Sequence, residues 1–275
     1  MIKALFFDID GTLIDHAAGG PGVMPASTLA CLQAARRKGI QLYVATGRPL
    51  EMVHFLEAYF PFDGFVAFNG QLAVTREGEV LHRLPHHPED IRKLVELVRA
   101  DPFPCLIQEQ EEKFYVSYFP IMAEHYRWAG LPVPQGPYDL RRLETVPVLQ
   151  FLAYIPFAEA KQRLSPLEHI EITSAGGEIL DVIPKAGGKE VGIAAVAARY
   201  GWNREEIMVF GDGQNDARML RWAGIGVALG NGVPAAKEAA DFVTTPIGED
   251  GVLQALLHYH ILTPEEVHLP PQKEA

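Results

Sequence analysis

The sequence predicts an α/β protein: a doubly wound, Rossmann-like core of parallel strands with an α+β domain inserted into it. At both ends of the chain, short apolar strand patterns alternate with helical patterns, which is the rhythm of βαβ units. Between them, from about His82 to Pro184, prolines and aromatic residues are frequent and apolar residues alternate with polar ones, as in an antiparallel sheet. We therefore expect a core from residues 1–82 and 185–275 and an inserted domain from residues 83–184.

The first element is a strand at residues 2–7. This segment is too short for a helix and too continuously apolar for a half-exposed strand, so it indicates a central parallel strand buried on both faces. A loop rich in glycine and proline follows at residues 19–22. The other elements expected before the insertion are a helix that ends at Gly39, a strand at residues 40–45, a helical segment carrying Met52, Phe55, Leu56 and Tyr59, and a strand at residues 65–68.

The same alternation returns after the insertion. Residues 189–200 form an alanine-rich helical pattern, and residues 207–210 form a short apolar strand that ends in Gly211-Asp212. The remaining expected elements are a helix at residues 217–222, a strand at 225–229 and a helix at 235–240. The chain therefore contains two βα sets that can join in one sheet.

Composition excludes several classes of function. The net charge of -11 leaves no basic stripe to neutralise nucleic-acid phosphates. Cys31 and Cys105 lie far apart, so a disulfide framework or a thiolate zinc site is not expected. The chain begins directly with a strand and has no apolar run long enough to span a bilayer. We expect a cytoplasmic protein that binds neither nucleic acid nor membrane.

Polar residues cluster at the expected ends of strands and starts of loops. Ligands of open α/β sheets bind at the carboxyl ends of the strands, and buried carboxylates need a cation or hydrogen-bond donors nearby. The four segments are Asp8/Asp10, Thr46-Gly47-Arg48, Lys189, and Gly211-Asp212-Gly213-Gln214-Asn215-Asp216. They predict one site that combines carboxylates, a lysine and close backbone amides.

Each of these segments alone also has a structural interpretation. Asp8 and Asp10 could cap a turn, Asp212 and Asp216 could cap helices, and Thr46-Gly47-Arg48 could be an ordinary turn before a helix. Lys185 competes with Lys189, although a cation at a helix start is electrostatically unfavourable and so favours a functional role for Lys189. The four segments taken together, in this order, favour a functional site.

In this order the segments resemble the motifs of the haloacid dehalogenase (HAD) superfamily. The opening reads as its D-x-D-G-T signature, Thr46 as the second motif, Lys189 as the third and G-D-x-x-N-D as the fourth. The chain resembles the Cof-type branch, whose cap follows the second motif, through three further segments: Phe68-Asn69-Gly70, Gly230-Asn231 and Glu249-Asp250-Gly251.

The resemblance implies a Mg²⁺-dependent phosphatase that forms an aspartyl-phosphate. Asp8 is then the nucleophile, and Asp10 protonates the leaving alkoxide and later takes a proton from water. The implied Mg²⁺ ligands are Asp8, the backbone carbonyl of Asp10, and Asp212. The implied phosphate contacts are the backbone amide of Ile9, Thr46, Gly47, Lys189 and Asn215. Asp216 either supports the metal or orients Lys189, and Arg48 and Asn69 are supporting residues.

The expected substrate is a small phosphorylated metabolite. The resemblance favours a sugar phosphate, with FMN or pyridoxal phosphate as alternatives. A phosphotransferase or mutase, or a non-catalytic protein that binds a phosphorylated ligand, remains open. The sequence indicates neither the oligomeric state nor the cap residues that set specificity. We interpret His86-His87, which lies between two prolines, as a solvated hinge into the insertion.

Overall fold

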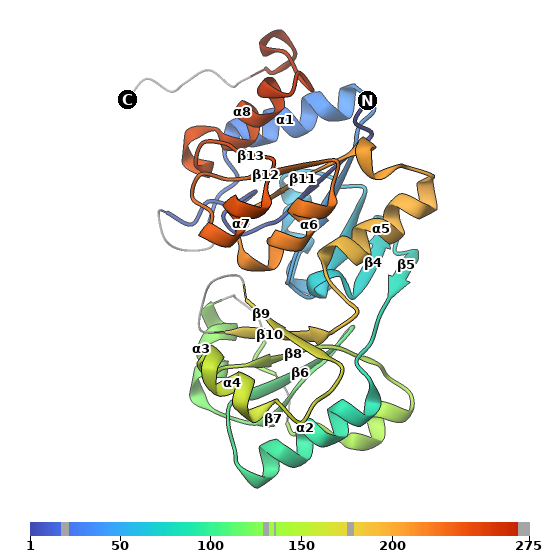
Figure 1. The fold of residues 1–275 in the computed structure, drawn as a ribbon, viewed down its shortest axis with the longest axis vertical. Helices are drawn as coiled ribbons and strands as arrows, with labels where there is room; N and C mark the ends of the chain where they lie inside the picture. The colour runs from blue at the N-terminus through green and yellow to red at the C-terminus, as the bar shows by residue number, and fades with distance from the viewer. Residues whose placement is uncertain (18–21, 129–131, 135, 175–178, 269–275) are drawn as a thin grey trace.

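The computed structural model describes residues 1–17, 22–128, 132–134, 136–174 and 179–268. It contains one eight-stranded and one five-stranded sheet, which lie in two separate layers of the molecule (Figure 1). Of the glycine- and proline-rich loop expected at residues 19–22, only Gly22 lies within the described residues. None of the described helices is long and apolar enough to cross a membrane.

The eight-stranded sheet has a parallel centre and an antiparallel edge. Its order is β13-β12-β11-β1-β2-β3-β4-β5, parallel from β13 to β3 and antiparallel from β3 to β5. The strands are β1 (Ala4–Phe7), β2 (Gln41–Ala45), β3 (Gly64–Ala67), β4 (Leu72–Thr75), β5 (Val80–Arg83), β11 (Ile207–Gly211), β12 (Ile225–Ala228) and β13 (Phe242–Val243).

Strand β1 is buried on both faces, as its sequence predicts. Leu5 and Phe7 belong to one apolar cluster, and Ala4 and Phe6 belong to the other, because successive side chains of a strand point to opposite faces. Helices α1 (Ala26–Arg37) and α8 (Gly251–His258) contribute to the first cluster. The second cluster includes side chains of α5 (Lys189–Tyr200), α6 (Ala217–Trp222) and α7 (Pro234–Ala239). Helices therefore cover both faces, and the predicted doubly wound core is confirmed.

The five-stranded sheet is antiparallel throughout, in the order β7-β6-β8-β10-β9. Its strands are β6 (Cys105–Glu109), β7 (Lys113–Ser117), β8 (Val148–Ala153), β9 (Ile170–Thr173) and β10 (Leu180–Pro184). Helices α2 (Pro88–Ala100) and α4 (Phe157–Arg163) pack in one apolar cluster with it, and α3 (Pro120–Trp128) packs in another. We call this layer the cap. The predicted α+β character is confirmed, whereas the predicted limits at residues 82/83 and 184/185 stay a prediction.

Short 3₁₀ helices connect many of these elements, and they correct one expectation. The helical segment expected around residues 52–59 closes i→i+3 hydrogen bonds and is broken at Val53, because it is confined between Pro49 and Pro61. The 3₁₀ helices are η1 (Leu50–Met52), η2 (His54–Ala58), η3 (Phe68–Gly70), η4 (Leu140–Glu144), η5 (Arg204–Glu206), η6 (Gln214–Asp216), η7 (Ile247–Glu249) and η8 (Pro264–Glu266). The hairpin of β4 and β5 was not expected from the sequence.

The interpretation of His86-His87 as a solvated hinge is wrong for His86. His86 is 3% exposed, its ring lies 5.1 Å from that of Phe151, and its Nε2 donates to the Val182 carbonyl at 3.0 Å. Burial lowers the pKa of this imidazole to about 4, and the hydrogen bond to Val182 opposes the shift only in part. The entry into the cap is therefore packed onto β8 and β10.

We expect His86 to make folding stability fall with acidity. The unfolded chain binds a proton near pH 6.5, whereas the folded chain does so only near pH 4, so the contribution of His86 is complete above pH 6.5 and is lost as the pH falls towards 4. The loss at pH 5 amounts to about 2 kcal/mol. In His86→Gln, which keeps an N–H donor but cannot titrate, urea unfolding at pH 7 and pH 5 should show a smaller loss. Equal losses in both proteins would contradict the assignment.

Candidate active site

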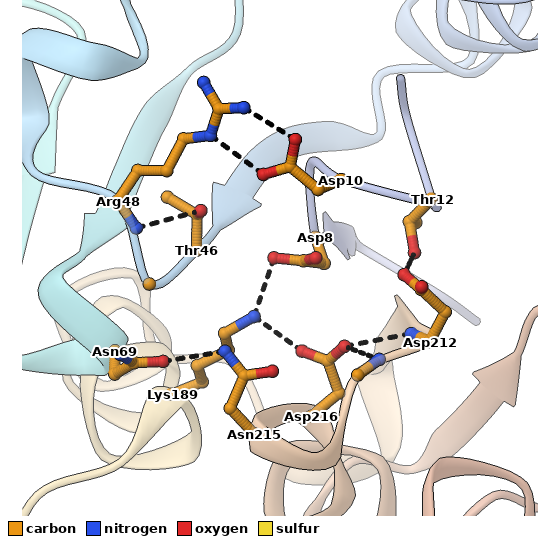
Figure 2. A network of polar contacts seen from close by, with 12 residues as sticks. Asp8, Asp10, Thr12, Thr46, Arg48, Asn69, Lys189, Asp212, Asn215 and Asp216 are labelled. Carbon is orange, nitrogen blue, oxygen red and sulfur yellow. Dashed lines mark hydrogen bonds and ion pairs between the residues drawn. The ribbon is translucent and has the colours of Figure 1, made fainter. Parts of the chain in front are cut away.

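The four polar segments meet at the carboxyl ends of the central strands. Asp8 follows β1, Thr46 follows β2 and Asp212 follows β11, while Lys189 is the first residue of α5. Figure 2 shows these side chains around one centre, with Lys189 between Asp8 and Asp216. The sheet therefore brings residues from opposite ends of the chain together at one edge.

Lys189 is the cation of this cluster. Its Nζ donates to Asp8 Oδ1 at 2.7 Å and to Asp216 Oδ1 at 2.5 Å, and its side chain is fully buried. The two carboxylates compensate for the unfavourable position of a cation at a helix start. Lys185 is exposed and has no place in the cluster, so the geometry favours Lys189 over its competitor.

Asp216 holds Lys189 in place. One of its carboxylate oxygens pairs with the lysine, and the other accepts hydrogen bonds from the backbone amides of Asp212 and Gly213 at 2.9 and 2.8 Å. Asp216 therefore reaches back to the turn after β11 and orients the lysine at the same time, and it makes no side-chain capping bond to α6, the helix that it precedes. Because both oxygens have partners, the arrangement favours orientation of Lys189 over direct support of a metal.

Asp212 is positioned by the first motif. Thr12 Oγ1 donates to Asp212 Oδ1 at 2.7 Å. Gly11 has a φ of +81°, and a Cβ at this residue would lie 2.2 Å from Asp212 Oδ2. The glycine therefore provides both the left-handed turn and the close approach of the carboxylate.

The carboxylates of this cluster are poorly compensated. Burial raises the pKa of Asp8 well above its usual range; Lys189 opposes the shift, and the neighbouring carboxylates add to it. Burial and the charge of Asp216 raise the pKa of Asp212 to about 7. Oxygens of Asp8, Asp212 and Asp216 all lie within 4.8 Å of one another. An all-oxygen donor set with excess negative charge suits a hard divalent cation such as Mg²⁺.

Asp10 lies at the exposed side of the site. Arg48 donates to it from Nε at 2.8 Å and from Nη2 at 2.6 Å, and His16 Nε2 lies 2.8 Å from its Oδ1. Burial acts to raise the pKa of this carboxyl, but Arg48 and His16 outweigh burial and lower it. In this arrangement Arg48 and His16 hold Asp10 in its ionised form.

The turn after β2 lies between the core and the cap. Thr46 is buried, and its Oγ1 accepts the Arg48 amide at 3.2 Å. The Gly47 carbonyl accepts from Gln150 Nε2 of the cap at 3.2 Å. Ile9 is buried in the core, and its carbonyl accepts the amides of Leu13 and Ile14. The predicted phosphate contacts of Ile9, Thr46 and Gly47 stay predictions.

Asn69 and Asn215 form the side of the site next to the cap. Asn215 Nδ2 donates to Asn69 Oδ1 at 2.9 Å. Asn69 Nδ2 donates to Gln150 Oε1 and to Asp181 Oδ2, each at 2.9 Å. Burial raises the pKa of Asp181 to about 6, while the Asn69 hydrogen bond and the charge of Lys189 lower it.

The structure adds four residues that the sequence analysis did not assign to the site: Thr12, His16, Gln150 and Asp181. Thr12 belongs to the first motif, so the motif itself contained the signal for it. Gln150 and Asp181 are single polar residues in the apolar strands β8 and β10, and such a polar residue indicates a buried hydrogen-bonding role. No pattern marked His16.

Comparisons with known proteins agree with this geometry. The Bacillus subtilis (strain 168) protein named "Putative phosphatase YkrA" is 30% identical over 261 residues, which cover 94% of this chain and 98% of that protein. The HMP-PP phosphatase of Escherichia coli (strain 55989 / EAEC) is 28% identical over 288 aligned positions, with 100% of both chains covered. The structure of the HAD subclass IIB sugar phosphatase BT4131 matches with a TM-score of 0.84 and 32% identity, covering 94% of this chain and 100% of the other.

A family model described as haloacid dehalogenase-like hydrolase matches residues 5–256. The match runs from β1 to α8 and includes all four motifs and the cap. The resemblance drawn from the motifs is thus confirmed, and the chain belongs to the haloacid dehalogenase-like hydrolases, a family of enzymes.

Proposed function

We propose that the protein is a Mg²⁺-dependent phosphatase that hydrolyses a small phosphorylated metabolite, with sugar phosphates as the favoured substrates, through an aspartyl-phosphate on Asp8. The observation that carries this proposal is the cluster of Asp8, Asp212 and Asp216 around the buried Lys189. Such a cluster has more negative than positive charge. A bound divalent cation would balance this charge and would allow an anionic phosphoryl group to approach Asp8.

The residues present fit Mg²⁺. The proposed ligands are Asp8, the backbone carbonyl of Asp10, and Asp212. Asp216 is excluded from this set because Lys189 and two backbone amides already occupy its oxygens. When bound, the cation would neutralise charge on the phosphoryl oxygens in the transition state.

Two residues of the chain, Asp8 and Asp10, carry out the reaction in two steps, each with one bond exchange at phosphorus and one proton transfer. Asp8 attacks phosphorus, the ester P–O bond breaks, and Asp10 gives its proton to the leaving alkoxide. Asp10 then takes a proton from water as the water oxygen attacks phosphorus, and the bond to Asp8 breaks with release of phosphate. Lys189, with Thr46 and Asn215, offsets charge on the phosphoryl oxygens. Arg48 and His16 lower the pKa of Asp10 and so favour its ionised form, which is the form that takes a proton from water in the second step.

The alternatives make different demands on the site. A protein that only binds a phosphorylated ligand does not need two carboxylates, Asp8 and Asp10, at the end of one strand, because they repel a phosphate. A phosphotransferase needs the same residues as a phosphatase but must pass the phosphoryl group to an organic acceptor instead of water. The name of the structural relative, a sugar phosphatase, supports hydrolysis and the sugar-phosphate class. Location in the cytoplasm stays a prediction.

We expect Asp8→Asn to abolish turnover. The assay measures phosphate release from a panel of sugar phosphates, FMN and pyridoxal phosphate, with Mg²⁺ or with EDTA. The wild-type protein should release phosphate with Mg²⁺ and not with EDTA. In Asp8→Asn, loss of the nucleophile should lower the rate of phosphate release by at least ~10³-fold. Asp101→Asn, at an exposed carboxylate of the cap, serves as the matched control and should keep full activity.

Two results would replace the proposal. Binding of a phosphorylated ligand without any phosphate release would leave a non-catalytic binding protein. Transfer of the phosphoryl group to an added alcohol or sugar in preference to water would identify a phosphotransferase.

We expect Thr12→Val to weaken Mg²⁺ binding, because Thr12 holds Asp212 by a 2.7 Å hydrogen bond. Loss of a hydrogen bond to a metal ligand lowers affinity about 10–100-fold. Calorimetric titration with Mg²⁺ measures the change. Thr263→Val, far from the site in the chain and at the start of η8, is the control. Unchanged affinity in Thr12→Val would show that Asp212 does not bind the cation in this orientation.

A further inference from the structure

A chain of polar side chains runs from the phosphoryl site into the cap. Asn215 donates to Asn69, and Asn69 donates to Asp181, with both distances 2.9 Å. Asn215 lies in the same turn as Asp212 and Asp216 (Figure 2), whereas Asp181 lies on strand β10 of the cap. We call Asn215, Asn69 and Asp181 the relay.

The relay has a fixed direction. An ionised carboxylate only accepts hydrogen bonds, whereas an amide donates from one end and accepts at the other. Asp181 therefore requires Asn69 to direct its Nδ2 towards the cap, which directs Asn69 Oδ1 towards Asn215. Asn69 Oδ1 in turn requires Asn215 to direct its Nδ2 towards the cap. This orientation leaves the buried Asn215 Oδ1 without a hydrogen-bond partner in the described part of the chain. Because Nδ2 carries two N–H groups and Asn69 takes one of them, the second N–H is the donor that Asn215 can offer to a phosphoryl oxygen.

Gln150 adds a second contact between Asp181 and the site. Its Nε2 lies 3.2 Å from Asp181 Oδ1 and 3.2 Å from the Gly47 carbonyl, and its Oε1 accepts from Asn69. Gln150 and Asn69 are each 1% exposed. A Cβ on Gly47 would lie 3.0 Å from Asn69 and 3.1 Å from Asp181, so these groups are already in close contact.

The backbone that carries Asn69 is strained. Phe68, Asn69 and Gly70 have φ values of 51°, 53° and 96°, and a bulky residue such as Phe68 rarely adopts a positive φ. Such a conformation persists where its surroundings fix it. Here the amides of Phe68 and Asn69 donate to the carbonyls of Arg48 and Thr46 at 3.0 and 2.9 Å, and the Asn69 side chain is held by Asp181 and Gln150.

We propose that Asp181 is a positioning residue for the phosphoryl site: through Asn69 it sets the orientation of the Asn215 amide, and with Gln150 it holds the turn at Gly47. The cap thus contributes to the site of the phosphoryl group as well as covering it. The cap carboxylate acts at a distance and needs no contact with the substrate. This inference rests on the proposed function for the identity of the phosphoryl site.

The test compares Asp181→Asn with wild type. Asp181 accepts from Asn69 at Oδ2 and from Gln150 at Oδ1. The substitution keeps the shape of the side chain but leaves only one oxygen, so an N–H₂ group must face one of these two donors. We expect kcat to fall about tenfold or more, the effect of losing one hydrogen bond to a buried charge, with KM little changed. The factor should be the same for p-nitrophenyl phosphate and for a sugar phosphate. Binding of orthovanadate in the presence of Mg²⁺ should weaken as well, measured by calorimetry. Vanadate has no leaving group, so its affinity reports on the phosphoryl site alone.

The matched control is Glu171→Gln. Glu171 lies on the neighbouring strand β9 and also connects cap and core, through a 2.8 Å ion pair with Arg218, but it has no link to Asn69. This variant should keep wild-type kcat and vanadate affinity. An equal loss in both variants would overturn the relay, because it would show a general effect of loosening the cap.

Hydrogen–deuterium exchange provides a readout that does not depend on activity. In Asp181→Asn the backbone amides of Phe68 and Asn69 should exchange about tenfold faster than in wild type and in Glu171→Gln. Unchanged exchange rates would overturn the proposal. A loss of kcat that differs between leaving groups, together with normal vanadate binding, would also overturn it, because it would show that Asp181 contacts the substrate directly. If wild type hydrolyses no phosphoester, the proposed function fails, and the exchange rates still decide whether the relay exists.

Discussion

The site depends on one buried lysine placed among carboxylates that would otherwise repel one another. Lys189 contacts Asp8 and Asp216 with no exposed surface of its own, and removal of a buried partner leaves an uncompensated charge, which is strongly destabilising. The lysine joins α5 to the ends of β1 and β11, so the same contacts that set the charge balance also fix the position of a helix on the sheet. The charge that remains uncompensated, on Asp8 and Asp212, is the feature of the site that fits the proposed divalent cation.

Two glycines allow the carboxylates to come this close. A Cβ on Gly11 would overlap Asp212, and a Cβ on Gly211 would lie 2.6 Å from the Asp216 side chain. Each glycine therefore lies against a carboxylate from the fourth motif. Gly11, in the turn after β1, lies against Asp212, and Gly211, at the end of β11, lies against Asp216. The glycines within the first and fourth motifs meet this requirement, because a side chain at either position would push apart groups that must meet within a few ångströms.

The sequence predicts those parts of the structure that local patterns determine. The strands that end in Asp8, Thr46 and Asp212 are apolar runs with polar ends, and their shared sheet edge follows from parallel topology. His86 was misjudged because its two flanking prolines indicate a loop, whereas its burial depends on Phe151 and Val182 far along the chain. The partners of Gln150 and Asp181 were missed for the same reason, whereas the 3₁₀ helices after Pro49 follow from the nearby prolines, whose effect the apolar pattern of residues 52–59 did not show. Hydrogen-bond partners across two domains have no periodicity that a single sequence could show.

The contact between cap and core combines an apolar part, in which Leu149 of β8 packs in the same cluster as Leu5 and Phe7, with a polar part that has an energetic consequence. An apolar interface would hold the cap closed in proportion to its buried area, and a substrate could then enter only at a large cost in free energy. If the cap moved away from the core, amide and carboxylate groups such as Asn69, Gln150 and Asp181 would exchange their mutual hydrogen bonds for bonds to water, so the net difference between the two states would be small. These same groups are directional, so they specify one closed arrangement without making it permanent. The proposed function would need both properties of its cap, and Asn69, Gln150 and Asp181 supply the directional contacts where the cap meets the candidate site.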